Sequence, residues 1–122
     1  MRKWLLRGII FLAVGAFTFA VYGAFCNLLF RCGCEGFWAA GGKFCNIHTI
    51  GVPHCPFCAT GNWGTFLPKT FILISQAAVI FLPAKPSAIS RLLLGILAFL
   101  IVGAAIGLVF RLWTHYPAFI GA

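Results

Sequence analysis

Residues 8–30, GIIFLAVGAFTFAVYGAFCNLLF, decide the fold, because they contain no charged side chain over 23 consecutive positions. A helix needs about 20 apolar residues to cross the hydrocarbon core of a bilayer. The preceding MRKWLLR is also how a signal peptide begins, but this apolar run is longer than such a peptide needs and VYGAFC is a poor cleavage site. We therefore expect residues 8–30 to form a retained transmembrane helix.

Two further apolar segments follow. Residues 88–113 contain LLLGILAFLIVGAAIGLVF and are also long enough to span a bilayer. The segment TFILISQAAVIFL, residues 70–82, is shorter, so we expect a helix over 64–82 that includes Lys69 and places its amine among the headgroups. The sequence PAKP at 83–86 should end that helix, because proline lacks the amide hydrogen that a helix uses.

The composition supports a membrane protein. The chain has 122 residues, is 62% hydrophobic, and has nine Lys and Arg residues against the single acidic residue Glu35. The basic residues lie at the edges of the apolar runs and form no stripe, which argues for anchoring at a lipid bilayer and against nucleic acid as a partner. We predict an all-α integral membrane protein, a single domain over 1–122 with three transmembrane helices and a Cys/His-rich, largely irregular loop at 31–62.

The charge distribution gives an orientation. With the N-terminus in the cytoplasm of a bacterial-type inner membrane, the 31–62 loop is extracytoplasmic. Arg2, Lys3, Arg7, Lys85 and Arg91 then lie inside, and Arg31, Lys43, Lys69 and Arg111 lie outside.

Small residues mark two candidate contact faces. Ala16, Ala20 and Ala24 follow one another at i+4 spacing, and Gly103 and Gly107 form a similar pair in the last helix. Small side chains let helices approach closely in lipid, although Ala and Gly are also simply common there. We expect these faces to pack helices or to dock other membrane subunits.

The loop contains five of the six cysteines and carries the clearest chemical signal. Cys45 and His48 form a C-x-x-H pair, and Cys55 and Cys58 form a C-x-x-C pair six residues later. Such pairs turn two side chains toward one tetrahedral ion, so these four residues predict a structural zinc site. Further candidate ligands, which could replace members of this set, are Cys32, Cys34 and His54.

The second pair carries two local resemblances. The sequence CPFCATG, from Cys55 to Gly61, resembles the metal-binding knuckle of rubredoxins and zinc ribbons, with the usual glycine displaced to Gly61. That resemblance implies a turn shaped by Pro56 with backbone amides donating to thiolate sulfurs. CPFC also resembles the active-site pair of glutaredoxins, which implies thiol–disulfide exchange at Cys55 and Cys58.

Two other cysteine chemistries stay open beside zinc. An even number of cysteines outside the cytoplasm is typical of disulfides, but we expect Cys26 to be buried in the first helix and unpaired, which leaves an odd number in the loop. An iron–sulfur cluster would use Cys32 or Cys34 together with Cys45, Cys55 and Cys58.

The residues offer no convincing catalytic set. The sequence has no Asp, one Glu and no glycine-rich nucleotide-binding turn, so we expect no enzyme. We predict a small accessory subunit of a larger membrane complex, of the kind found in respiratory or photosynthetic assemblies, with its loop clasped by zinc. The alternatives are a membrane thiol–disulfide oxidoreductase that uses Cys55 and Cys58, a loop held by disulfides without metal, and a protein that handles exchangeable metal.

Overall fold

The computed structural model describes residues 1–36, 38, 43, 45–82, 85, 87–117 and 119–120, with the side chains of 62 and 65 left out, and every regular element in this part of the chain is a helix. This confirms the expected all-α fold for the described residues. The elements are α1 (Arg2–Phe30), the short 3₁₀ turn η3 (Asn46–His48), α2 (Pro56–Ala59), α3 (Asn62–Phe81) and α4 (Ala88–Thr114).

Two helices have the dimensions of membrane spans. By length and composition, α1 and α4 are long and apolar enough to cross a bilayer, and the apolar part of α3, Phe66–Phe81, is shorter. Helix α1 begins at Arg2 instead of the expected residue 8, and α4 nearly matches the expected range of 88–113.

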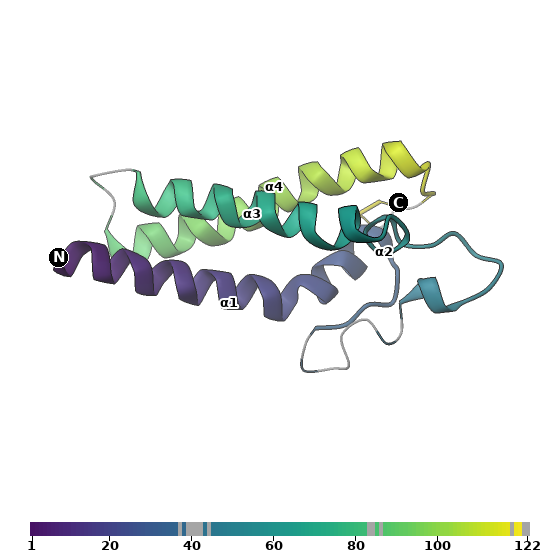
Figure 1. Cartoon of the computed structure of the whole chain (residues 1–122), viewed down its shortest axis with the longest axis horizontal. Helices are drawn as coiled ribbons and strands as arrows, with labels where there is room; N and C mark the ends of the chain where they lie inside the picture. The colour runs from purple at the N-terminus through teal and green to yellow at the C-terminus, as the bar shows by residue number, and fades with distance from the viewer. Residues whose placement is uncertain are drawn as a thin grey trace.

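The three long helices lie side by side, as Figure 1 shows. The N-terminus, the end of α3 and the start of α4 lie at one end of the bundle, and the end of α1, α2, the start of α3 and the end of α4 lie at the other. The loop is less irregular than expected, because η3 and α2 form within it. We call this the loop end of the bundle.

Helices α1 and α4 meet at glycines. A Cβ atom added to Gly103 would lie 2.6 Å from Cε1 of Phe25, and one added to Gly107 would lie 2.8 Å from Cδ1 of Leu29. The predicted Gly103 and Gly107 therefore lie in a contact within this chain, where each receives a large side chain of α1. Gly95, nearer the start of α4, accommodates Val14 in the same way. A Cβ atom added there would lie 3.0 and 3.2 Å from Cγ1 and Cγ2 of Val14.

The predicted alanine row of α1 does not form the buried face of this helix. Ala16 is exposed, and Ala20 and Ala24 are half-buried. Helix α1 buries a different set of side chains against the bundle: Ile10, Val14, Thr18, Phe25, Cys26, Leu29 and Phe30.

Gln76 joins the three long helices from the middle of α3. Its Nε2 donates to Oγ1 of Thr18 on α1 at 2.8 Å and to the carbonyl oxygen of Gly95 on α4 at 3.2 Å. The Gln76 side chain is fully buried, and its Oε1 has no hydrogen-bond partner among the described residues. The amide thus fixes how the helices are aligned, as expected for a polar side chain at mid-depth.

The end of α3 is capped by two arginines. Arg7 of α1 donates to the carbonyl oxygen of Phe81 at 2.9 Å, and Arg91 of α4 donates to that of Ile80. The last carbonyls of a helix lack partners within the helix and carry partial negative charge. These guanidinium groups therefore stabilise the end of α3 as well as the neighbouring helices.

The start of α3 is packed against α2. Helix α3 begins at Asn62 instead of residue 64, so Pro68 lies inside it. A Cβ atom on Gly64 would lie 2.0 Å from the carbonyl oxygen of Phe57, so only glycine allows α2 to sit this close to α3. This contact places the cysteines that flank Phe57 at the loop end of the bundle.

Candidate metal centre

All six cysteines meet at the loop end of the bundle. They come from the last turns of α1 (Cys26), the segment after it (Cys32 and Cys34), the residue before η3 (Cys45), and the start and interior of α2 (Cys55 and Cys58). All six are free thiols, five are buried and Cys58 is half-buried. We call them the cysteine cluster.

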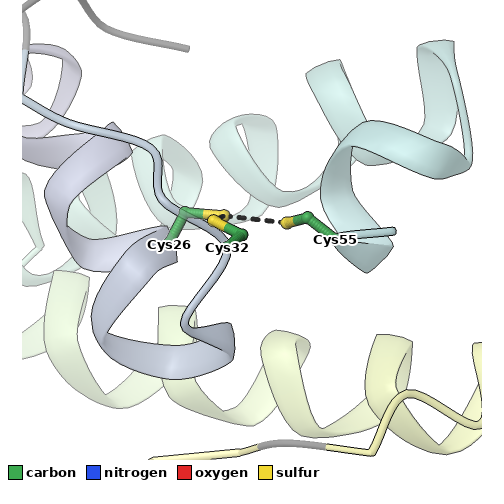
Figure 2. A group of neighbouring side chains, drawn as sticks. All are labelled: Cys26, Cys32 and Cys55. Atoms are coloured by element: carbon green, nitrogen blue, oxygen red, sulfur yellow. Dashed lines mark hydrogen bonds between the residues drawn. The ribbon is translucent and has the colours of Figure 1, made fainter. Parts of the chain in front are cut away.

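The sulfur atoms are in direct contact. The Sγ atom of Cys26 lies 3.4 Å from that of Cys32 and 3.1 Å from that of Cys55, and the Sγ atoms of Cys45 and Cys58 are 3.2 Å apart. Figure 2 shows the sulfurs of Cys26 and Cys32 together, facing Cys55 across the gap between α1 and α2.

The cluster contains three groups of three sulfurs, each group with all its sulfurs within 4.8 Å of one another. The groups overlap, because each shares one sulfur with each of the others. The three groups are Cys26, Cys32 and Cys55; Cys32, Cys34 and Cys45; and Cys45, Cys55 and Cys58. Each of them is a candidate site for a metal ion that prefers sulfur ligands.

The chain folds back on α1 immediately after that helix ends. Arg31 ends α1 with a left-handed conformation, φ 52°, and the side-chain oxygen of Asn27 accepts from the backbone N–H of Gly33 at 2.9 Å. The backbone of Glu35 then lies against Gly23, where an added Cβ atom would come within 1.9 Å of the Glu35 carbonyl oxygen. This close approach brings the segment that carries Cys34 back over the turn that carries Cys26.

Asn46 connects the remaining segments. Its backbone N–H donates to the carbonyl oxygen of Cys32 at 2.6 Å, and its Oδ1 accepts from the backbone N–H of Cys55 at 2.6 Å. Its Nδ2 donates to the hydroxyl oxygen of Tyr116, which in turn donates to the carbonyl oxygen of Phe30, both at 2.8 Å. The backbone and side chain of one residue thus position two cysteine segments relative to Phe30 at the end of α1 and Tyr116 just after α4.

The ring of Phe57 anchors α2 in the bundle. It stacks on Tyr22 with ring centroids 5.8 Å apart and meets Phe30 and Phe110 edge-on at 5.1 and 5.2 Å. Phe57 lies between Cys55 and Cys58 in the sequence, so its burial fixes both thiols. The aromatic side chains also exclude water from one side of the cysteine cluster.

Hydrogen bonds among the thiols favour the thiolate form at two positions. Bonds from Cys34 and then Cys55 lower the pKa of Cys58 to about 3. Bonds from Cys26 and Cys34, and a further one from the backbone N–H of Cys34, lower the pKa of Cys32. A hydrogen bond to the charged form of a thiol stabilises that form, which is also the form that binds metal.

At Cys45 burial dominates. Desolvation raises the pKa of Cys45 to about 11 against the opposing effect of a hydrogen bond from the backbone N–H of Ile47. The amide-to-sulfur bonds at Cys32 and Cys45 are of the kind that the metal-knuckle resemblance implied for the CPFC turn.

The structure brings together three of the four predicted zinc ligands. Cys45, Cys55 and Cys58 form one of the sulfur groups. His48 is exposed and belongs to none of the groups, because η3 directs Asn46 and not His48 toward the cluster. His54 is also exposed, and its Nε2 bonds to the carbonyl oxygen of Thr49 at 3.0 Å.

The sequence prediction missed Cys26. Cys26 is buried and forms no disulfide, as expected, but it was not among the candidate ligands, and the structure places it in contact with Cys32 and Cys55. The available signal was its position: Cys26 lies one turn from the end of α1, within reach of a loop that folds back on that helix. The alternates Cys32 and Cys34 also belong to the cluster.

No family model, curated protein or solved structure matches the chain.

Proposed function

We propose that the protein is an integral membrane protein with three transmembrane helices whose loop end is closed by a thiolate-bound metal, and that it acts as a small accessory subunit of a larger membrane complex. The observation that supports this most is the convergence of six free, mostly buried thiols from four separate segments on one point.

A bound cation explains why these sulfurs lie together. Thiols packed with their sulfurs 3.1–3.4 Å apart in a buried site are poorly solvated, and those that ionise repel one another. A metal ion removes both costs, and its binding energy then contributes directly to folding. The short, glycine-rich loop has little apolar surface of its own, so a metal is an effective means of ordering it. Zinc, the ion expected from the sequence, is the first ion to test.

The exposed surface of the long helices supports a membrane location. Large apolar side chains such as Leu12, Ile101 and Val109 are at least 60% exposed along α1 and α4. A continuous apolar surface of this kind requires lipid or another subunit. Trp4 and Trp113, near opposite ends of the bundle, are exposed as well and suit the two interfaces. We propose a cytoplasmic N-terminus and an extracytoplasmic loop end on the charge distribution given above.

A structural role fits the described residues better than catalysis. The only carboxylate, Glu35, is exposed and belongs to none of the sulfur groups. Thiol–disulfide exchange is disfavoured because Cys55, the first thiol of the C-x-x-C pair, is fully buried and inaccessible to a partner disulfide.

Elemental analysis of the full chain tests this proposal. The protein would be purified in detergent under reducing conditions, and its metal content and thiols accessible to a disulfide reagent would be counted before and after denaturation. We expect at least one thiophilic metal ion per chain and at least three thiols that become reactive only after the metal is removed. A metal-free protein with four or more oxidised cysteines would refute the proposal that a metal bound by the cysteine cluster holds the loop (the metal clasp). Co-purification of partner subunits from native membranes tests the accessory role, which a stable lone monomer would contradict.

A further inference from the structure

The arrangement of the sulfurs indicates how many ions the cluster holds. Three cysteines, Cys32, Cys45 and Cys55, each belong to two of the sulfur groups. The other three, Cys26, Cys34 and Cys58, each belong to one. This is the pattern of a polynuclear thiolate cluster, in which sulfurs shared between two groups bridge two ions and the remaining sulfurs bind one ion each.

A single zinc ion uses this arrangement poorly. Zinc in structural sites takes four ligands at the corners of a tetrahedron. The groups found here contain three sulfurs each, and one tetrahedral ion would leave two of the six thiols without a metal. Soft monovalent Cu(I) binds thiolates strongly and accepts three of them in a trigonal plane. Three-sulfur groups that share corners suit this coordination.

The surroundings are also those that Cu(I) requires. The buried position of five cysteines and the aromatic side chains around Phe57 limit access of water and oxygen to the sulfurs. The exposed His48 and His54 remain outside the groups, so the ligands are all sulfur.

We propose that the cysteine cluster binds three or more Cu(I) ions as one polynuclear copper–thiolate cluster, with Cys32, Cys45 and Cys55 as bridging ligands. This inference rests on the proposed function, namely that the cluster binds metal. Binding involves no electron transfer: copper enters as Cu(I), each bound thiol loses its proton to solvent, and the sulfurs remain reduced.

An anaerobic titration tests the number of ions. The full-length, metal-free protein in detergent would receive Cu(I) as its acetonitrile complex in the presence of a chromogenic Cu(I) chelator, and native mass spectrometry would count the bound ions. We expect cooperative uptake of three or more ions per chain. X-ray absorption at the copper edge should then show sulfur-only coordination and a copper–copper distance.

Serine variants distinguish bridging from terminal ligands. Cys32→Ser removes a sulfur from two groups and should reduce the count by two or more ions, whereas Cys58→Ser removes a sulfur from one group and should reduce it by one at most. His48→Ala is the matched control and should leave the count unchanged. The absorption measurement on the unsubstituted protein does not depend on how well the variants fold.

The outcomes separate this inference from the proposal on which it rests. One or two Cu(I) ions without a copper–copper distance, or tighter binding of a single zinc ion, would overturn the polynuclear cluster and leave the metal clasp intact. Equal losses in Cys32→Ser and Cys58→Ser would overturn the assignment of bridging ligands. Failure to bind either metal would overturn both proposals.

Discussion

Whether substitution of Gly23 by alanine stabilises or destabilises the protein depends on the loop that packs against this residue. Gly23 lies inside α1, where replacing glycine by alanine ordinarily stabilises a helix by about 1 kcal/mol. The new methyl group, however, would lie 1.9 Å from the carbonyl oxygen of Glu35, roughly 1.5 Å closer than ordinary van der Waals contact. The obstacle is backbone and cannot rotate away, so the loop must move.

The magnitude follows from these two opposing effects. Overpacking a rigid site costs about 1–3 kcal/mol, and a backbone obstacle belongs at the upper end of that range. Once the gain in helix propensity is subtracted, we expect the docking of residues 32–36 on α1 to become less favourable by about 2 kcal/mol of free energy. If the loop docks on α1 only when metal binds, this loss weakens metal binding by about 30-fold.

Metal competition against a chromogenic chelator measures this change, and hydrogen exchange of the 31–36 amides reports the docking directly. Gly8→Ala is the matched control, because Gly8 lies in the same helix and an added Cβ there meets nothing within 4 Å. The control should gain stability and keep its metal affinity. The reasoning is refuted if Gly23→Ala is as stable as Gly8→Ala and binds metal equally well.

Three further predictions concern the anchor of α2, the central amide and the thiols. Phe57→Ala should lower the free energy of unfolding by about 3–5 kcal/mol in a thermal or denaturant melt, because a fully packed ring is lost, whereas the exposed Phe71→Ala should change it by less than about 0.5 kcal/mol. Gln76→Leu should change the same quantity by less than about 1 kcal/mol, because it removes two hydrogen bonds and also a buried carbonyl oxygen that has no hydrogen-bond partner among the described residues. In the metal-free protein, iodoacetamide should alkylate Cys58 equally fast at pH 6 and pH 8, since a pKa of about 3 keeps it a thiolate throughout.

Each of these predictions has a clear contrary result. Equal effects of Phe57→Ala and Phe71→Ala would show that the ring does not anchor α2. A loss above about 2 kcal/mol in Gln76→Leu would show that its carbonyl oxygen has a partner whose loss matters. An alkylation rate at Cys58 that rises tenfold per pH unit between pH 6 and 8 would indicate an ordinary, unassisted thiol.

The helices were predictable from sequence because long apolar runs without charge, such as residues 8–30, identify them directly. The faces through which the helices contact one another were only partly predictable from the sequence. Helix α4 offers glycines at which another helix can approach closely, and Gly103 and Gly107 are indeed covered by α1. Helix α1 is apolar on all sides, so no periodicity distinguishes the face of Val14 and Leu29 from the more exposed face of Ala16.

The candidate site shows where local spacing stops being informative. A C-x-x-C spacing constrains Cys55 and Cys58 directly, and the structure keeps them in one group. A C-x-x-H spacing does not fix where His48 points, because the 3₁₀ turn η3 directs Asn46 inward and leaves the histidine exposed. Cys26 joins the cluster through a tertiary contact at Gly23, and no local pattern encodes that contact.

The position of Cys26 makes metal binding more than a property of the loop. Because one ligand candidate belongs to α1 and two belong to α2, a metal in the cluster joins a long helix to the element that Phe57 anchors against α4 through Phe110. Removal of the metal should therefore loosen α2 and expose the aromatic side chains beneath it, together with the loop. For an accessory subunit this coupling has a consequence: the surface presented at the loop end depends on whether the metal is bound, so assembly with a partner at this end should require the metal-loaded form.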